Sequence, residues 1–207
     1  MKITWLGHSC FLLESGGFRL LLDPYRDVQG YPPLQVGVNA VYCSHDHYDH
    51  AAVEQTQMLL NLVENPFTVT EIHSWHDEHQ GAERGCNTIR VLEAEGLRIA
   101  HMGDLGTDLD DEQIRQMGHI DLLLVPIGSV YTIGAVKANR TAHQLGDPAV
   151  IPMHYRLGDL GFSELSHLES FLAFYPEEQQ LRLPGNSWQV EPRPGMVIVP
   201  TFQWPEE

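Results

Sequence analysis

One short block of the sequence gathers four side chains of the kinds that bind metal ions. The block His45-Asp46-His47-Tyr48-Asp49-His50 has the pattern H-x-H-x-D-H and directly follows an apolar run. Because residues i and i+2 of an extended chain point to the same side, His45 and His47 can bind one metal ion together. Asp49 and His50 are adjacent and can bind a second ion beside it. A polar loop rich in histidine by chance is the alternative, and so dense a cluster after a buried strand disfavours it.

This pattern resembles that of the metallo-β-lactamase-fold hydrolases, which carry H-x-H-x-D-H after a strand. Two further stretches, Trp5-Leu6-Gly7-His8-Ser9-Cys10-Phe11 and Leu22-Asp23-Pro24, are similar to the branch that contains ascorbate-6-phosphate lactonase-like proteins and phospholipase D-type relatives. The resemblance covers essentially the whole chain. It implies an α/β fold, an αβ/βα four-layer sandwich with a dinuclear metal site at the edge of its two sheets.

The resemblance also implies three further ligands. Gly103-Asp104 follows an apolar strand, as the bridging aspartate of the family does, and His154 ends a short strand, as the family's last histidine does. For the third histidine, the His76-Asp77 unit matches best, with His79 as the runner-up and His101 as a more distant alternative. The expected metal ligands are therefore His45, His47, Asp49, His50, His76, Asp104 and His154.

Three residues are candidates for supporting the ligands. His8 matches a position near the metals in similar proteins, and a simple turn residue is its alternative. Asp23 and Asp77 could each orient a ligand imidazole through its second ring nitrogen. Asp23 could equally serve the turn that follows its strand.

Other residues are candidates for contact with the site or a substrate. His101 lies close in sequence to the Asp104 turn, so it is a possible neighbour of the metals. Tyr131 could donate a hydrogen bond to a substrate oxygen, although a packed tyrosine is more common. Arg84 and Arg156 could bind an anionic group, although a surface role is more common for each alone.

The elements that must position these residues are short strands followed by alternating strands and helices. The first strands are expected at Lys2–Leu6, Phe11–Glu14 and Arg19–Asp23. Helical spacing of apolar residues predicts a helix over Ala51–Glu64, and Ser163 can cap a helix that runs to Tyr175. Further helices are expected at Asp110–Met117 and Ala135–Leu145. We expect a single domain, residues 1–207, with two packed sheets and helices outside them.

Composition narrows the function classes. The chain has 207 residues, is 43% hydrophobic and carries 12 Lys+Arg against 28 Asp+Glu, a formal charge of −16. No basic stripe is present, so nucleic acid is not an expected partner. The 3 cysteines form no CxxC pair, which disfavours a zinc ribbon or a redox dithiol. The start of the sequence does not resemble a signal peptide and no stretch suits a membrane helix, so we expect a cytoplasmic protein without a membrane partner.

These observations predict a metal-dependent hydrolase that acts on a small anionic ester, a phosphodiester or a lactone. Two divalent ions, zinc first and manganese or iron as alternatives, would share a hydroxide that attacks the substrate. Asp49 and Asp104 are the expected catalytic residues, because Asp49 could also carry a proton to the leaving group. Two ions, two carboxylates and one hydroxide leave a local charge of about +1 on an acidic protein, which favours a small anion.

Two other functions stay open at this point. One is an RNA-processing nuclease similar to the tRNA-processing members of the same fold, which the net charge disfavours. The other is a metal-binding scaffold without hydrolytic activity. Redox diiron members of the fold typically carry glutamate where this chain has His47, so His47 favours hydrolysis.

Overall fold

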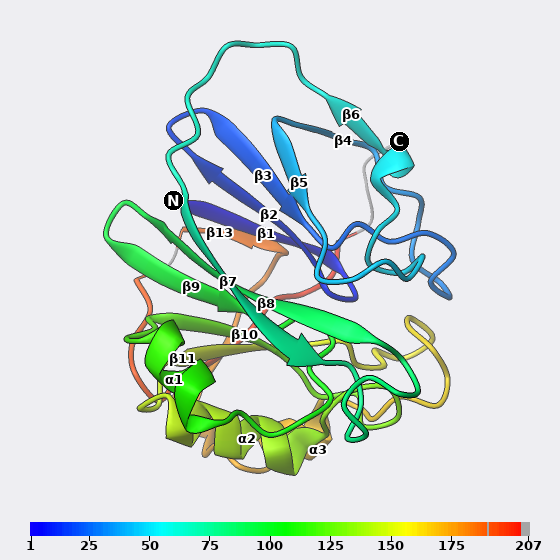
Figure 1. Ribbon diagram of the computed structural model, residues 1–207, viewed down its shortest axis with the longest axis vertical. Helices are drawn as coiled ribbons and strands as arrows, with labels where there is room; N and C mark the ends of the chain where they lie inside the picture. Colours follow the sequence, from blue (N-terminus) through cyan, green and yellow to red (C-terminus); the bar gives the residue numbers. More distant parts are fainter. Residues whose placement is uncertain (190, 204–207) are drawn as a thin grey trace.

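Two β-sheets packed face to face make up the body of the protein. The computed structural model describes residues 1–189 and 191–203. Within these residues the smaller of the two sheets has five strands and the larger has seven (Figure 1). The smaller sheet has the order β13 (Ser187–Trp188), β1 (Lys2–Gly7), β2 (Cys10–Ser15), β3 (Phe18–Leu22), β5 (Ala40–Tyr42). The larger has the order β12 (Gln180–Arg182), β14 (Val197–Val199), β11 (Ala149–Met153), β10 (Leu122–Pro126), β9 (Leu97–His101), β8 (Cys86–Ala94), β7 (Thr68–Trp75).

Strand direction brings six chain segments to one edge of the sandwich. In the smaller sheet β2 is antiparallel to both β1 and β3, and β5 is parallel to β3, so β1, β3 and β5 share one direction. In the larger sheet β8 is antiparallel to both β7 and β9, and β9, β10 and β11 are parallel. The segments that leave β1, β3, β5, β7, β9 and β11 contain every predicted metal ligand.

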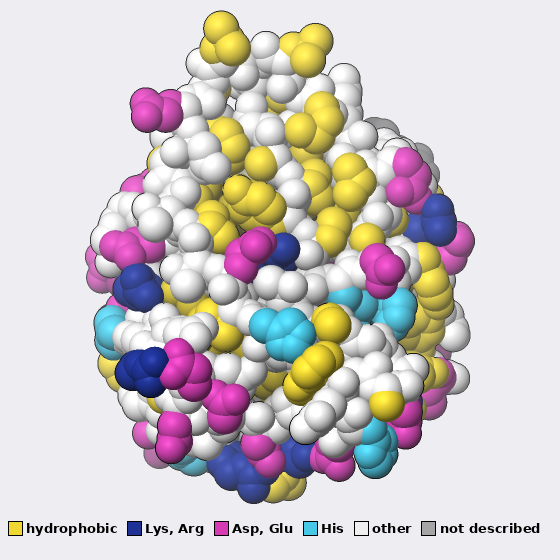
Figure 2. Space-filling view, in the orientation of Figure 1, with side chains coloured by type: hydrophobic (Ala, Val, Ile, Leu, Met, Phe, Trp, Pro, Cys, Tyr) yellow, Lys and Arg dark blue, Asp and Glu magenta, His cyan; other side chains and the backbone are white. Residues whose placement is uncertain are grey.

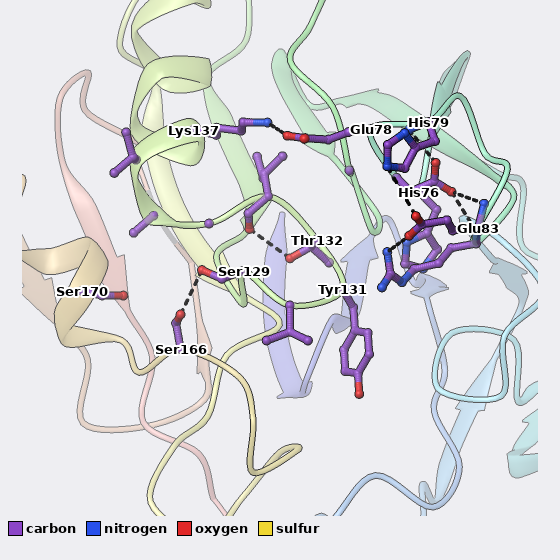
Figure 3. A pocket seen from close by; sticks show the side chains of 18 of the residues that line it. His76, Glu78, His79, Glu83, Ser129, Tyr131, Thr132, Lys137, Ser166 and Ser170 are labelled. Carbon is purple, nitrogen blue, oxygen red and sulfur yellow. Dashed lines mark hydrogen bonds and ion pairs between the residues drawn. The ribbon is translucent and has the colours of Figure 1, made fainter.

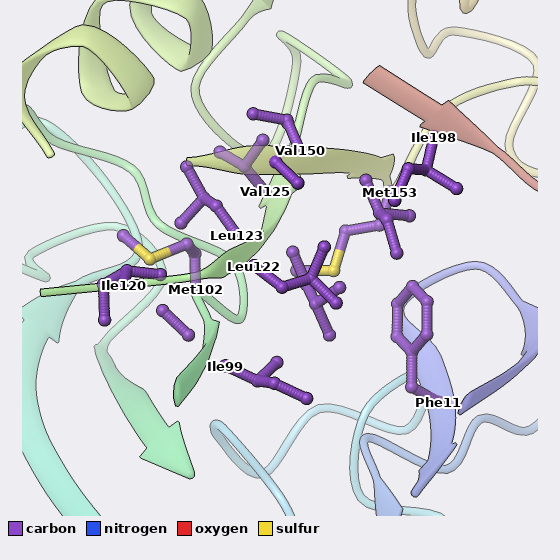
Figure 4. Packing of buried hydrophobic residues seen from close by; sticks show 14 of the residues in the cluster. Phe11, Ile99, Met102, Ile120, Leu122, Leu123, Val125, Val150, Met153 and Ile198 are labelled. Carbon is purple, nitrogen blue, oxygen red and sulfur yellow. The ribbon is translucent and has the colours of Figure 1, made fainter. Parts of the chain in front are cut away.

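The apolar core lies between the sheets and under the helices. All five residues of β10 are buried, as expected for a strand with parallel neighbours on both sides. Its residues Leu122, Leu123 and Val125 pack with Ile99 of β9 and Met153 of β11 (Figure 4). Close packing of this kind resists displacement. It therefore fixes the ends of β9 and β11, from which two of the predicted ligands leave the sheet.

All three α-helices of the described chain cover the outer face of the larger sheet (Figure 1). They are α1 (Asp111–Met117), α2 (Ala135–Gln144) and α3 (Glu169–Leu172). The first two confirm the predictions for those segments. The predicted helix from Ser163 to Tyr175 was too long, because the segment before α3 bonds elsewhere: the amide of Ser166 donates to the carbonyl of Gly128. None of these helices has the length and apolar character to cross a membrane within the described residues.

The predicted helix over Ala51–Glu64 was wrong. The segment contains a 3-10 turn (Val53–Gln55) and the strand β6 (Thr56–Met58), which pairs in parallel with β4 (Val36–Val38). An amphipathic helix needs an open apolar surface to bury its face. Here the loop that precedes β4 already covers the smaller sheet, with Tyr25, Val28, Tyr31 and Leu34 buried.

Candidate metal centre

Three imidazoles from the two sheets form the first group of the site. His45 and His47 follow β5, and His76 follows β7 directly. One ring nitrogen of each lies within 4.8 Å of the others. The ring centroids are 4.6 Å apart for His45 and His47 and 4.6 Å apart for His45 and His76. The structure thus brings these three predicted ligands into one group.

A second group lies beside the first. Asp49, His50 and His154 each offer an atom within 4.8 Å of the others, and His8 belongs to the same group. Oδ2 of Asp49 lies 3.3 Å from Nε2 of His8 and 3.6 Å from Nε2 of His50. His8, which the sequence left undecided between the site and a turn, is therefore part of the site.

Asp104 joins the two groups. Its Oδ2 lies 3.2 Å from Nε2 of His76, in the first group, and 3.2 Å from Nε2 of His154, in the second. Its Oδ1 lies 3.2 Å from Nε2 of His50. One buried carboxylate therefore touches ligands of both groups, which is the position expected of a bridging ligand.

The donor atoms fit divalent metal ions. Nε2 of His45, His50 and His154 and Oδ1 of Asp104 are buried without a hydrogen-bond partner. Buried polar atoms are nearly always paired, so several orphans in one place need a common partner. Two ligands on one tetrahedral ion with bonds of about 2.1 Å are about 3.4 Å apart. The separations of 3.2 to 3.6 Å between Asp104, Asp49 and the imidazoles match that spacing.

Burial sets the protonation of part of the site. Burial lowers the pKa of His45 to about 3, with His50 contributing, and burial with His154 lowers the pKa of His8 to about 4. These imidazoles are neutral near pH 7, which is the form that binds metal. For His50 and His76, burial also acts downward, but the carboxylate of Asp104 outweighs it and raises the pKa of both.

Metal binding should therefore release protons. In the metal-free chain the raised pKa values keep His50 and His76 at least partly protonated at pH 7, and a metal can bind only the neutral rings. We expect titration with Zn²⁺ at pH 7 to release about one to two protons per chain, and fewer at pH 9. Calorimetry in buffers of different ionisation enthalpy measures this number. His119→Gln, which removes an exposed histidine, should leave it unchanged, and a heat independent of the buffer would contradict the expectation.

A hydrogen-bonded pair orients ligands in both groups. Oδ2 of Asp23 accepts from Nδ1 of His50 at 2.7 Å and from Oγ of Ser44 at 2.6 Å. Oγ of Ser44 in turn lies 2.9 Å from Nδ1 of His45 and accepts its proton. Both imidazoles therefore present Nε2 to the site. The predicted orienting role of Asp23 agrees with this geometry, whereas Ser44, next to His45 in the sequence, was missed.

The turn that carries Asp104 tolerates only glycine before it. Gly103 has φ +54°, and a Cβ there would lie 2.3 Å from Oδ1 of Asn87 and 2.4 Å from Cβ of Ser44. Oδ1 of Asn87 accepts from the amide of Asp104 at 2.9 Å, and its Nδ2 donates to the carbonyl of Met102. Asn87 thus fixes the backbone of the bridging residue, a role that the sequence did not reveal.

The alternative histidines lie elsewhere. His79 has a side chain that is 67% exposed and pairs with Glu83. His101 is buried, and its Nε2 donates to the carbonyl of Ser9 while its Nδ1 accepts from the amide of Gly103. His101 therefore supports the Gly103 turn, and neither residue joins the ligand groups.

Three other candidates make contacts away from the ligand nitrogens. The carboxylate of Asp77 orients no imidazole and accepts backbone N–H groups of its own loop. Oη of Tyr131 donates to Glu164. Arg156 donates to the carbonyls of Gly158 and Ser163 and does not line the cavity over the ligands. In this structure Arg156 therefore supports its own loop.

A cavity of about 420 Å³ gives access to the ligands. His47, Asp49, His76 and Asp104 form its floor, and aromatic and charged side chains form its walls. Figure 2 shows histidine side chains at the surface midway down the molecule, below the hydrophobic side chains that lie over the smaller sheet. The volume lies within the range of known small-molecule sites.

Comparison with known proteins gives a consistent result. Residues 2–154 match the model of the β-lactamase superfamily domain. A UPF0173 metal-dependent hydrolase of Methanoculleus marisnigri is 30% identical, and the match covers 93% of this chain and 98% of that protein. A UPF0173 metal-dependent hydrolase of Korarchaeum cryptofilum is 28% identical, and the match covers 75% of this chain and 83% of that protein. A crystal structure from Thermotoga maritima, a candidate Zn-dependent hydrolase of the metallo-β-lactamase superfamily, is 31% identical with a TM-score of 0.77 and covers 98% of this chain and 99% of that one.

Proposed function

The chain belongs to the UPF0173 metal-dependent hydrolases of the metallo-β-lactamase superfamily, and from this premise we propose that it hydrolyses a small anionic ester, either a phosphodiester or a lactone, at two divalent cations. Membership confirms the predicted fold class and the coarse activity. The number of ions, their identity as zinc and the ester substrate are our proposals. So is the branch similar to ascorbate-6-phosphate lactonase-like proteins, which the stretch from Trp5 to Phe11 supports.

The position of Asp104 is the observation that carries the proposal. One carboxylate lies 3.2 Å from ligand nitrogens of both groups, and the two groups hold three further ligands each. His45, His47 and His76 would hold one ion, and Asp49, His50 and His154 the other. All these donors are nitrogen or carboxylate oxygen, which suits zinc.

Divalent cations held by these residues would lower the pKa of water toward neutrality and polarise the bond under attack. The chain's own residues prepare the rest. Asp23 and Ser44 fix two ligand rings, and burial excludes competing water from them. Asp49 lines the cavity with its Oδ2 close to Nε2 of His8, whose lowered pKa keeps that ring neutral. Burial raises the pKa of Asp49, but His8 and His50 outweigh it and hold the pKa well below its usual range, so the carboxylate is ionised. We assign Asp49 to accept a proton from the attacking water and pass it to the leaving group.

The proposed substrate is small and negatively charged. Two divalent ions would outweigh the two carboxylates of Asp49 and Asp104 and leave the ligand site positive. The cavity of about 420 Å³ would enclose most of a small molecule. The formal charge of −16 on the chain argues against a polyanion such as RNA, because the rest of the protein would repel it.

Two measurements test the proposal together. Protein purified without chelator is analysed for metals and then assayed with lactones, phosphodiesters and thioesters. We expect about two divalent ions per chain, mainly zinc, and turnover of a lactone or phosphodiester that stops on removal of the metal. A fully loaded protein that is inert with all three classes would favour a metal-binding scaffold and would overturn the proposal.

A further inference from the structure

A second cavity adjoins the one over the metal ligands. It has a volume of about 600 Å³ and reaches from the His76 loop to the start of α2. His76, Arg84 and Tyr131 line both cavities. Figure 3 shows Tyr131 between a side with Ser129 and Ser166 and a side with the loop of His76, His79 and Glu83. A substrate held over the ligands can therefore extend past Arg84 and Tyr131.

We propose that Arg84 selects the substrate by binding an anionic group, a carboxylate or a phosphate, at the junction of the two cavities and away from the bond that is broken. This inference rests on the proposed hydrolytic function and adds a specificity-determining residue to it. The substrate is then bifunctional, with a scissile ester over the metals and a second, acidic group at Arg84.

The contacts of Arg84 leave its charge accessible. Its guanidinium carbon lies 5.7 Å from the centre of the Tyr131 ring, and its side chain is 32% exposed. Stacking on an aromatic ring uses the face of the guanidinium and leaves the N–H groups in its plane for a carboxylate or phosphate. Its ion-pair partner is Glu83, at 3.3 Å, whose side chain is 53% exposed. Such an exposed pair is weak and can be exchanged for a ligand.

Arg84 is also the single Lys or Arg among the residues that line the cavity over the ligands. In the neighbouring cavity the other cation is Lys137, which is paired with Glu78 (Figure 3). Glu164, which also lines the cavity over the ligands, accepts hydrogen bonds from Tyr131 and Ser163. Arg84 is therefore the one Lys or Arg side chain shared by the two cavities, so an anionic group that extends from the metal ligands would meet it first.

The loop that carries Arg84 is held in place before any ligand binds. Oδ1 of Asp77 accepts from the amides of His79 at 2.8 Å and Gly81 at 3.0 Å. Oδ2 accepts from the amides of Glu83 at 3.1 Å and Arg84 at 2.7 Å. Since Asp77 directly follows the ligand His76, one short loop fixes both the ligand and the arginine. A preorganised loop loses little entropy when the substrate binds.

The test uses 4-nitrophenyl esters that differ only at the end of the acyl chain. The acyl chain ends in a carboxylate, a phosphate, a neutral methyl ester or a trimethylammonium group. Comparing the first two substrates shows which kind of anion is preferred. For the metal-loaded protein we expect kcat/KM for an anionic ester to exceed that for the neutral one about ten- to hundredfold. Arg84→Gln should remove this ratio mainly through KM, with metal content unchanged. Arg84→Lys should keep part of it, and Arg140→Gln, which changes an arginine outside both cavities, should keep all of it.

Equal kcat/KM for the anionic and neutral esters would overturn the inference. So would an anionic-to-neutral ratio that survives Arg84→Gln. A preference for the trimethylammonium ester would overturn it too and would assign recognition to Glu164. A second measurement needs no turnover. Calorimetry compares the dissociation constants of glutarate and monomethyl glutarate with the metal-loaded protein. If neither these esters nor the lactones and phosphodiesters of the earlier panel are hydrolysed, but glutarate binds more tightly and Arg84→Gln removes the difference, the hydrolytic function fails and the anion site stands. If glutarate has no advantage, the anion site fails on its own.

Discussion

Asp104→Ala is expected to abolish metal loading at one or both sites and, with it, the hydrolytic activity. The carboxylate of Asp104 contacts Nε2 of His76, His50 and His154, so its loss removes one ligand from each group at once. Elemental analysis should find fewer than about one ion per chain. Loss of a shared, buried ligand should weaken metal binding more than loss of a ligand of one site alone, because both ions lose the attraction of its charge.

Asp108→Ala is the matched control for this variant. It removes an aspartate from the same loop, but its side chain pairs with Arg140 outside the site, so metal content should not change. Thermal unfolding with and without chelator separates loss of metal from loss of fold, since a bound metal stabilises only a chain that can bind it. We expect chelator to lower the Tm of the Asp108 variant by more than that of Asp104→Ala. Full metal content and activity in Asp104→Ala would refute its role as a bridge.

The local spacing of ligands was predictable because it depends on few residues. His45, His47, Asp49 and His50 lie in one loop, so the chain itself keeps them together wherever that loop goes. The positions of Asp104 and His154 followed from the family resemblance and from apolar strands whose ends are easily recognised. The parallel arrangement of β9 and β11 then brings both residues to the same edge.

What escaped prediction depends on contacts between distant segments. The sequence favoured His76 over His79 only through the family resemblance, because the contacts that separate them are tertiary. His76 directly follows β7, whereas the carboxylate of Asp77 accepts from the amides of the loop that carries His79 away from the site. Ser44 and Asn87 are ordinary polar residues whose partners, Asp23 and Asp104, lie 21 and 17 residues away. The helix over Ala51–Glu64 failed for the same kind of reason, because a loop elsewhere in the chain occupies the surface it would have needed.

Asp23→Asn is expected to weaken metal binding at both sites by about ten- to hundredfold, the usual effect of losing a residue that orients metal ligands. Asp23 accepts directly from His50 and, through the hydroxyl of Ser44, reaches His45, so it acts on one ligand of each group. An asparagine amide is uncharged, and if its oxygen replaces Oδ2 its NH2 group faces the backbone amide of Ser44, which donates to Oδ1 of Asp23 at 2.7 Å. In the opposite orientation the NH2 group faces His50 and the Ser44 hydroxyl. The amide therefore meets a donor with a donor in either orientation, and it does not raise the basicity of the rings.

Ser44→Ala separates the two halves of this effect. It breaks the path from Asp23 to His45 but leaves the 2.7 Å contact between Asp23 and His50 in place. We expect it to weaken only the first site, so that one ion of two is lost early in a competition titration with a chromogenic chelator. Asp121→Asn, which removes the carboxylate from an exposed pair with His119, is the matched control and should leave both affinities unchanged.

The outcome also decides between orientation and folding as the role of Asp23. Burial acts to raise its pKa, but His101, His50 and Ser44 prevail and lower it to about 2. Its contribution to the stability of the folded chain is therefore present above about pH 4 and is lost as the pH falls toward 2. A purely structural role predicts lower stability for Asp23→Asn at pH 7 with unchanged metal dissociation constants, and that result would contradict our assignment. Weaker binding in a chain that still unfolds cooperatively would support it, because the affinity then changes without the fold.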